Sequence, residues 1–255
     1  MQFVDKKVCG KKRKKMETKF KFKKNDKVVV LTGAGISAES GLKTFRDHNG
    51  LWENHRVEQV ATPEAFRADP ELVWKFYKQR YFQLPEVKPN PGHFALKKLE
   101  DYLEENFFII TQNVDGLHYL VGNERVLEMH GSLRRSFCSK CKTKYKMKEI
   151  DLSPEVPKCE KCGGFIRPDI VWFGEMPYFL DEIDEILRKA DYFLVVGTSG
   201  TVYPAAQFLN IAKYNGAFTI GVNLDKPLNV DFIDEFHQGK SGEILPKLVD
   251  LWIGK

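Results

Sequence analysis

The chain has 255 residues, of which 42% are hydrophobic and 29% are charged, the composition of an ordinary globular protein that can bury a full core. No apolar run approaches the roughly 18 residues that cross a bilayer, and the N-terminus lacks the apolar segment of a signal peptide. We therefore expect no membrane partner and a cytoplasmic location. The formal net charge is +5, but residues 1–24 alone carry eleven Lys/Arg against two acidic residues, so the rest of the chain is mildly acidic.

The basic N-terminal run, residues 1–24, includes "KKRKK" and is typical of a solvated, disordered tail. A tail of this charge could instead bind nucleic acid or an acidic membrane, or direct nuclear import, which is the alternative location. We expect the folded body to begin at residue 25.

From that point on, apolar strand-like runs alternate with helix-like patterns. We expect strands at 28–31, 107–113, 125–131, 169–175, 192–199 and 217–223, and helices at 63–84, 92–105, 180–190, 204–214 and 242–252. The strands are apolar throughout, which indicates a parallel sheet with helices on both faces. The predicted fold class is α/β, with a Rossmann-like sheet.

Two segments interrupt this alternation. Residues 135–167 are polar, lysine-rich and contain four cysteines, so we predict a separate zinc-ribbon module there. Residues 45–90 are expected to form a helical insertion. The Rossmann-like domain then comprises residues 25–134 and 168–255.

The motif "TGAGIS", residues 32–37, follows the first strand and opens a helix. Gly33 and Gly35 let the backbone approach a pyrophosphate, and a helix N-terminus supplies N–H groups and a positive dipole. The acidic residue that a dehydrogenase carries about twenty positions further on is not clearly present, so an ordinary dehydrogenase fits poorly. A plain tight strand-to-helix turn is the alternative.

The pairs Cys138-x-x-Cys141 and Cys159-x-x-Cys162 are separated by seventeen residues. Each pair presents two thiolates in a knuckle, and four thiolates close a structural zinc site with no open position for water. Two disulfides are the competing interpretation, which the absence of a secretory signal disfavours.

Polar residues follow two of the predicted strands at the edge where ligands bind in such sheets. Gln112, Asn113 and Asp115 of "TQNVDG" could contact ribose hydroxyls and a carboxamide, although turn and helix-cap chemistry is an alternative. Among six histidines, His130 ends a predicted strand at this edge, and its near-neutral pKa suits a general base.

The predicted helix at 72–84 places Val73, Tyr77, Arg80 and Leu84 on one stripe. A guanidinium on a buried face is costly unless it is paired. Either its alkyl stem covers the core while its head reaches water or a carboxylate, or the arginine has a ligand.

Taken together, these motifs resemble the sirtuins, which are NAD-dependent protein-lysine deacylases. The resemblance rests on "GAGISAESGL", "TFRD", "GLW", "TQNVDGLH", "MHG", the two Cys-x-x-Cys pairs, "VWFGE", "GTSGTVYP" and "GVNLD", in this order from about residue 27 to 250. It implies a Rossmann-like domain and a zinc-ribbon module, with NAD and acyl-lysine meeting between them.

The resemblance also implies roles for individual residues. NAD would be bound by Gly33, Ala34, Gly35, Ser37, Phe45, Arg46, Trp52, Gln112, Asn113, Val114, Asp115, Gly197, Thr198, Ser199, Asn223, Leu224, Asp225 and Ser241. The substrate would contact Ala61, Tyr77, Arg80, Val171, Phe173, Gly174 and Glu175, with 171–175 pairing to the peptide as a strand. His130 and Asn113 would be catalytic, and the four cysteines would hold one Zn²⁺.

In the family's reaction, the acyl oxygen attacks the anomeric carbon of the nicotinamide ribose and expels nicotinamide. A histidine base then activates a ribose hydroxyl, and hydrolysis gives free lysine and acylated ADP-ribose, so NAD is consumed. Tyr77-x-x-Arg80 resembles the signature of class III sirtuins, which prefer succinyl- or malonyl-lysine over acetyl-lysine. A phenol and a guanidinium at i and i+3 can converge on one carboxylate, and Ala61 would widen the acyl pocket.

Two other functions remain open from the sequence. A mono-ADP-ribosyltransferase would use the same scaffold with a different acceptor. A zinc-ribbon protein that binds nucleic acid would use the basic tail and the lysines near the cysteine knuckles, but the ribbon lacks obvious interleaved aromatic residues for base stacking. Acylated lysine side chains of proteins and NAD are therefore the expected partners, with nucleic acid confined to the tail.

Overall fold

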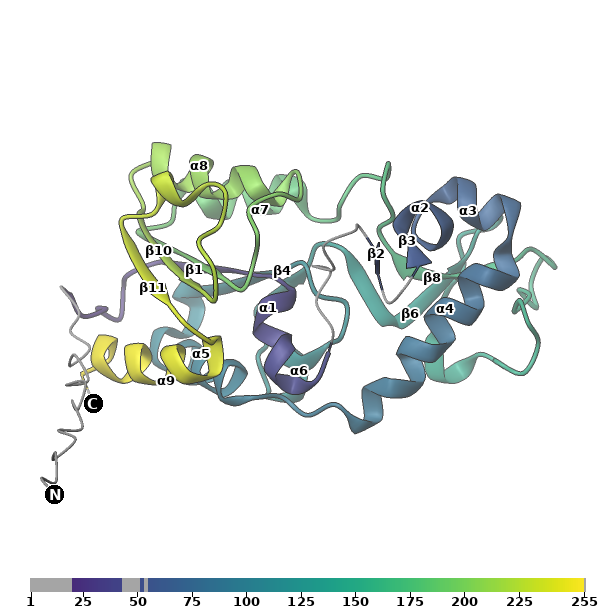
Figure 1. The fold of residues 1–255 in the computed structure, drawn as a ribbon, viewed down its shortest axis with the longest axis horizontal. Coiled ribbons are helices and arrows are strands. Elements are labelled where there is room, and N and C mark those ends of the chain that lie inside the picture. The colour runs from purple at the N-terminus through teal and green to yellow at the C-terminus, as the bar shows by residue number, and fades with distance from the viewer. Residues whose placement is uncertain (1–19, 43–50, 53–54, 255) are drawn as a thin grey trace, which may run out of the picture.

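The computed structural model describes residues 20–42, 51–52 and 55–254. Its larger sheet has six parallel strands in the order β11-β10-β9-β1-β4-β5 (Figure 1). These strands are β1 Val28–Thr32, β4 Phe107–Thr111, β5 Val126–Glu128, β9 Tyr192–Val196, β10 Phe218–Asn223 and β11 Glu235–Gln238. The predicted parallel, Rossmann-like sheet is confirmed.

Helices cover both faces of this sheet, as the apolar strands require. α5 (Pro91–Leu103) and α9 (Ser241–Trp252) lie on one face, and α7 (Leu180–Arg188) and α8 (Ala205–Tyr214) lie on the other (Figure 1). In β1, Val28 and Val30 pack toward α5 and α9, whereas Val29 and Leu31 pack toward α7 and α8. Alternate side chains of a strand point to opposite faces, so β1 is buried on both sides.

The register of the strands brings their carboxyl ends together. Thr32 at the end of β1 lies between Thr111 of β4 and Val196 of β9. The residues that follow each strand therefore meet at one edge of the sheet, where α1 (Ala34–Ser37) and α6 (Leu117–Leu120) begin.

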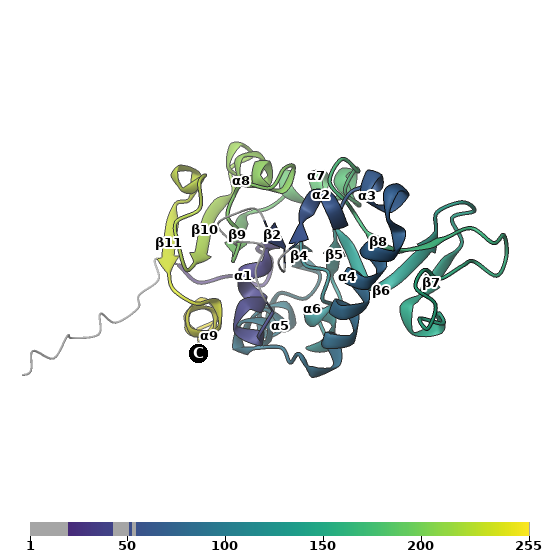
Figure 2. The same cartoon turned by 45° about the vertical axis from the view of Figure 1, so that its right-hand side comes forward.

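A smaller antiparallel sheet has the strand order β7-β6-β8 and extends away from the larger one (Figure 2). Its strands are β6 Gly131–Cys138, β7 Lys144–Lys146 and β8 Ile166–Ile170. It shares a core with α4 (Pro70–Gln83), and Trp74 Nε1 donates to Ile166 O at 2.8 Å. The remaining elements are β2 Leu51–Trp52, β3 His55–Arg56, α2 Val57–Val60, α3 Pro63–Ala68 and the short 3₁₀ turns η1 Ala38–Ser40, η2 Leu84–Glu86, η3 Glu104–Asn106, η4 Met147–Glu149 and η5 Val230–Phe232.

The observed elements differ from the sequence-based expectations in three places. The helix expected at 63–84 is two helices, because Asp69 caps α4 by accepting from Leu72 N at 2.9 Å and Pro70 starts its first turn. The strand expected at 169–175 is β8, which ends at Ile170 and belongs to the small sheet. β11 was not predicted, since "EFHQ" alternates polar and aromatic residues at the sheet edge.

The folded body begins before the expected residue 25. Phe22 is 3% exposed, and its N–H donates to Trp252 O at 2.9 Å. Phe20 packs against Tyr192 and Phe218. Residues 1–19, which make up most of the predicted tail, lie outside the described residues. Among the helices that the structure describes, none is long and apolar enough to cross a membrane.

Candidate functional site

A cavity of about 700 Å³ opens at the carboxyl edge of the large sheet and continues toward α4 and the small sheet. This volume lies within the usual range of ligand pockets. The predicted site residues that line it are Gly33, Ala34, Gly35, Ser37, Ala61, Tyr77, Arg80, Gln112, Asn113, Val114, Asp115, His130, Val171, Phe173, Gly174, Glu175, Gly197, Thr198, Ser199, Asn223, Leu224, Asp225 and Ser241. Phe45 and Arg46 lie outside the described residues, as does the side chain of Trp52.

The glycine-rich turn after β1 packs directly on the turn after β9. Gly33 N donates to Val196 O at 3.0 Å, and Gly35 N donates to Gly197 O at 2.8 Å. A Cβ on Gly35 would lie 2.6 Å from Gly197 Cα, closer than real Cβ contacts. Gly197 has a φ of +63°, a conformation that side chains disfavour. Because these residues have no side chains, the turn after β1 and the turn after β9 pack in direct contact at the cavity wall. The N–H groups of Gly33 and Gly35 donate the hydrogen bonds that join the two turns.

Asn113 and Asp115 are held in place through Ser37. Asn113 Nδ2 donates to Ser37 Oγ at 3.2 Å and to Gly33 O at 3.1 Å. Ser37 Oγ in turn donates to Asp115 Oδ2 at 2.8 Å, and Asp115 Oδ1 accepts from Leu117 N at 2.8 Å. Burial raises the pKa of Asp115, although these hydrogen bonds oppose the rise. The polar cluster expected from "TQNVDG" is therefore assembled, and it also caps α6.

The other side of the cavity is organised around Thr198. Gln112 Nε2 donates to Thr198 Oγ1 at 3.1 Å, and Asn223 Nδ2 donates to Thr198 O at 2.8 Å. The ends of β4, β9 and β10 are thereby tied to one another by side-chain amides. All three residues line the cavity and are among those predicted to bind NAD.

His130 lies on the segment that joins β5 to β6. Its Nδ1 is 3.2 Å from Gln112 O. A carbonyl oxygen only accepts, so this contact assigns the proton to Nδ1 and leaves the Nε2 lone pair as the basic site. Burial lowers the pKa of His130, while the bond to Gln112 O raises it in part. The imidazole is therefore neutral at neutral pH, the state that a general base requires.

Tyr77 and Arg80 line the same cavity from α4. Tyr77 is fully buried, and its hydroxyl accepts from Trp172 Nε1 at 2.9 Å. Burial raises the pKa of Tyr77, so the phenol remains protonated. Arg80 is half-buried, with Nη1 donating to Phe76 O at 2.6 Å and its guanidinium carbon 3.2 Å from the centre of the Phe76 ring. The phenol of Tyr77 and the guanidinium of Arg80 thus line the same wall of the cavity, on one face of α4.

The segment after β8 is fixed by an ion pair beneath it. Arg167 Nη1 donates to Glu175 Oε1 at 2.7 Å, and the guanidinium carbon lies 3.3 Å from the centre of the Trp172 ring. Glu175 Oε2 accepts from Trp172 N at 2.9 Å. Glu175, predicted to contact substrate, therefore also closes the turn that presents Phe173 and Gly174 to the cavity.

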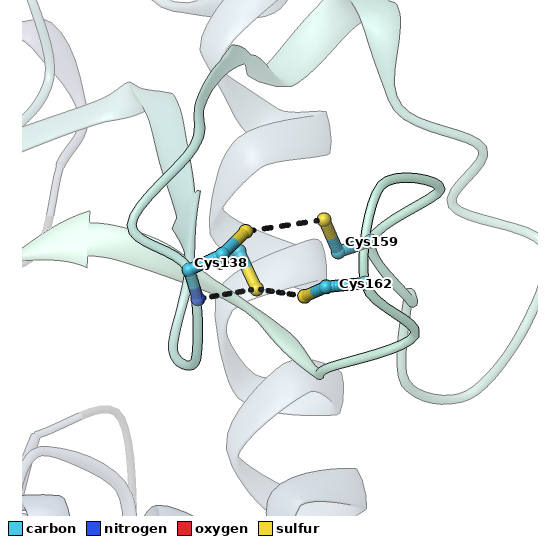
Figure 3. A group of neighbouring side chains, drawn as sticks. Cys138, Cys159 and Cys162 are labelled. Carbon is cyan, nitrogen blue, oxygen red and sulfur yellow. Dashed lines mark hydrogen bonds between the residues drawn. The ribbon is translucent and has the colours of Figure 1, made fainter.

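The four cysteines come together at one end of the small sheet, and Figure 3 shows Cys138, Cys159 and Cys162 in this cluster. Their sulfur atoms all lie within 4.8 Å of one another, with Cys138 Sγ 3.5 Å from Cys162 Sγ and Cys141 Sγ 3.6 Å from Cys159 Sγ. Four thiolates at about 2.3 Å from a tetrahedral zinc ion have sulfur–sulfur separations of about 3.8 Å. The donor set and spacing thus fit one structural Zn²⁺, and none of the four is in a disulfide.

Sequence reasoning missed several residues that line the cavity. Trp172 positions the Tyr77 hydroxyl, and Gln83 lies one turn beyond Arg80 on α4. Glu39 Oε1 accepts from Gly242 N at 2.8 Å and so ties the first turn to the start of α9. Trp172 and Glu39 stand inside the motifs "VWFGE" and "GAGISAESGL", but their partners are distant in sequence, so no local pattern signals these contacts.

Comparison with known proteins agrees with this geometry. The Sir2 family matches residues 33–204. An NAD-dependent protein deacylase of Pyrococcus furiosus is 47% identical over 89% of this chain and 93% of its own length. One of Bdellovibrio bacteriovorus is 50% identical over 87% of this chain and 94% of its own. A Sir2 homologue solved as an NAD complex superposes with a TM-score of 0.80 at 42% identity, over 87% of each chain.

The chain belongs to the Sir2 family. The predicted membership of the sirtuins is therefore confirmed, and so is the prediction of an NAD-dependent protein deacylase that uses NAD as co-substrate. The predicted cysteine cluster suited to zinc is also confirmed. A second solved structure, a Sir2–p53 peptide–NAD⁺ complex, superposes with a TM-score of 0.78 at 32% identity, over 88% of this chain and 92% of its own.

Proposed function

We propose that this sirtuin preferentially removes acidic acyl groups, succinyl and malonyl, from protein lysines, and removes acetyl groups more weakly. The observation that carries the proposal is the placement of Tyr77 and Arg80 on the wall of the cavity that also holds His130. A protonated phenol and a guanidinium both donate hydrogen bonds, and a carboxylate is the acyl terminus that accepts from both. Acetyl offers no such acceptor.

The surrounding residues support an acyl pocket at this place. Ala61 is 3% exposed and leaves room beside Tyr77, while Phe173 N donates to Ala61 O at 2.9 Å. The backbone of the 171–175 segment is thereby joined to the helical insertion on one side of the cavity. A peptide strand added to this segment would direct its acyl-lysine side chain between α4 and His130.

We assign the general base to His130 and the nicotinamide side of NAD to Asn113 and Asp115. The neutral His130 with Nε2 as its basic atom suits abstraction of a proton from a ribose hydroxyl. Asn113 and Asp115, fixed by Ser37, suit recognition of amide and hydroxyl groups. NAD, when bound, supplies the anomeric carbon that the acyl oxygen attacks.

The test measures NAD-dependent release of lysine from succinyl, malonyl and acetyl peptides by the wild type, Arg80→Met and Lys75→Met. Lys75 is an exposed cation on the same helix and serves as the matched control. A charge-assisted hydrogen bond is worth about 1.5–3 kcal/mol, so Arg80→Met should lower kcat/KM for succinyl peptide about 10- to 100-fold and leave acetyl peptide within about twofold. Equal losses on both substrates would return Arg80 to a structural role.

His130→Ala separates the enzyme class from the acyl preference. This variant should lose deacylation of every peptide while keeping the wild-type melting temperature, because it removes a side chain that the cavity exposes to ligand. Deacylation that survives in His130→Ala would contradict the assignment of the base without bearing on Arg80.

A further inference from the structure

Arg135 joins the two sheets beside the segment that carries His130. Arg135 lies in β6 of the small sheet, and its Nη1 is 2.5 Å from Oε2 of Glu128, the last residue of β5 in the large sheet. Its Nε is 3.0 Å from Asp169 Oδ2 in β8. One guanidinium thus bridges a carboxylate from each sheet.

This bridge encloses the short connection from β5 to β6, which contains Met129 and His130. Glu128 fixes its start, and Asp169 pairs in register with Ser132 just after its end. A Cβ on Gly131 would overlap Asp169 O, so the backbone of Gly131 is in close contact with the backbone of Asp169. His130 therefore lies in a short connection between the sheets, and the same arginine pairs with carboxylates at both of its ends.

Further bonds make this connection rigid. Tyr178 OH donates to Asp169 Oδ1 at 2.7 Å, and Tyr178 N donates to Met129 O at 2.9 Å. His130 O accepts from Val171 N at 2.9 Å. The carboxylates of Glu128 and Asp169 have side chains 3% and 14% exposed, whereas Arg135 is 41% exposed. Removal of the arginine would leave two shielded carboxylates without their shared cation, which is strongly unfavourable.

We propose that Arg135 is a positioning residue for the base: its ion pairs with Glu128 and Asp169 set the angle between the sheets and hold His130 at the reacting ribose. Arg135 does not line the cavity and touches no ligand position, so it acts through the His130 segment alone. Lysine cannot replace it fully, because one ammonium lacks the forked donors that reach two carboxylates from different directions. This inference rests on His130 as the base and is independent of the acyl preference.

The two stages of the reaction make the proposal testable. Nicotinamide exchange into NAD, driven by acyl peptide, reports the first step, which needs no base, and lysine release reports the whole reaction. A displaced base lowers lysine release but not exchange, whereas general damage to the fold or to NAD binding lowers both. Misplacement of a reacting group by about 1 Å can cost about 100-fold in rate.

The experiment compares Arg135→Met, Arg135→Lys and Arg188→Met with the wild type. Arg188 pairs with Asp184 on α7 at 2.7 Å and is the matched control. We expect Arg135→Met to lower kcat for lysine release about 10- to 100-fold relative to exchange, with KM for NAD and peptide within about twofold. Arg135→Lys should recover part of the loss, and Arg188→Met should change neither rate.

Two outcomes would overturn the proposal. Exchange and lysine release that fall in parallel in both Arg135 variants would make the arginine structural, and rates unchanged in Arg135→Met would make it dispensable. In a His130→Ala background, where lysine release is already lost, Arg135→Met should cause no fall in nicotinamide exchange, because the two substitutions remove one function. If His130→Ala itself retains activity, the assignment of the base fails first, and the two failures are distinguished.

Discussion

Two histidines buried beside the carboxyl end of β1 should make this fold sensitive to acid. The ring centres of His93 and His118 are 5.1 Å apart, and His118 Nε2 lies 3.0 Å from Thr32 Oγ1. Burial lowers the pKa of His93 to about 4 and that of His118 to about 3, the latter with help from the charge that His93 would carry. His93 also forms part of the capping box of α5.

The magnitude follows from the pKa difference between the folded and unfolded chain. The folded-state pKa values lie below the ordinary value of about 6.5, so the unfolded chain binds more protons as the pH falls. The contribution of the two neutral histidines to the free energy of unfolding is complete above pH ~6.5. It is lost progressively as the pH falls from ~6.5 toward the folded-state pKa values. Between pH 7 and pH 5 each histidine should remove about 2 kcal/mol from the free energy of unfolding. Two histidines together remove about 4 kcal/mol, which is roughly a quarter of a stability of ~15 kcal/mol and most of a stability of ~5 kcal/mol.

Urea unfolding at pH 7 and at pH 5 measures this loss. His93→Gln keeps a side chain that can serve the capping box of α5 but does not titrate. It should lose about 2 kcal/mol less than the wild type between the two pH values, since one of the two histidines no longer takes up a proton. His55→Gln, at a half-exposed position of β3, is the control and should lose as much as the wild type. If the wild type and His93→Gln lose the same free energy, the buried pair does not govern acid stability.

The cysteine cluster and the glycine turn give two further predictions. Cys159→Ser should release the one bound zinc ion, measured by atomic absorption, and lower the melting temperature, because the metal joins both cysteine pairs of the small sheet. Cys9→Ser, in the basic N-terminal run, should retain the metal. Gly35→Ala should cost about 1–3 kcal/mol of stability, measured by urea unfolding, because its Cβ would lie 2.6 Å from Gly197 Cα. Its calorimetric Kd for NAD should also rise; unchanged affinity would show that the contact with Gly197 does not shape the site.

Much of this molecule could be predicted because its signals are local. The apolar run of β1, the turn at Gly33 and Gly35, and the two cysteine pairs each depend on residues within a few positions of one another. The Asp69-Pro70 signal that splits the expected helix at 63–84 is also local, and it outweighs the continuous apolar stripe because a cap and a proline start a new helix there.

The type of each element and the chemistry available at the strand ends can therefore be predicted from local sequence, since backbone propensity and side-chain type are properties of short segments. Contacts between residues far apart in the sequence are known only from the folded molecule. Tyr77 contacts Trp172 across 95 positions, β8 joins the small sheet, and Arg135 pairs with Asp169 across 34 positions. Such pairings depend on how two sheets pack around a shared cavity, and no periodicity within either segment encodes that geometry.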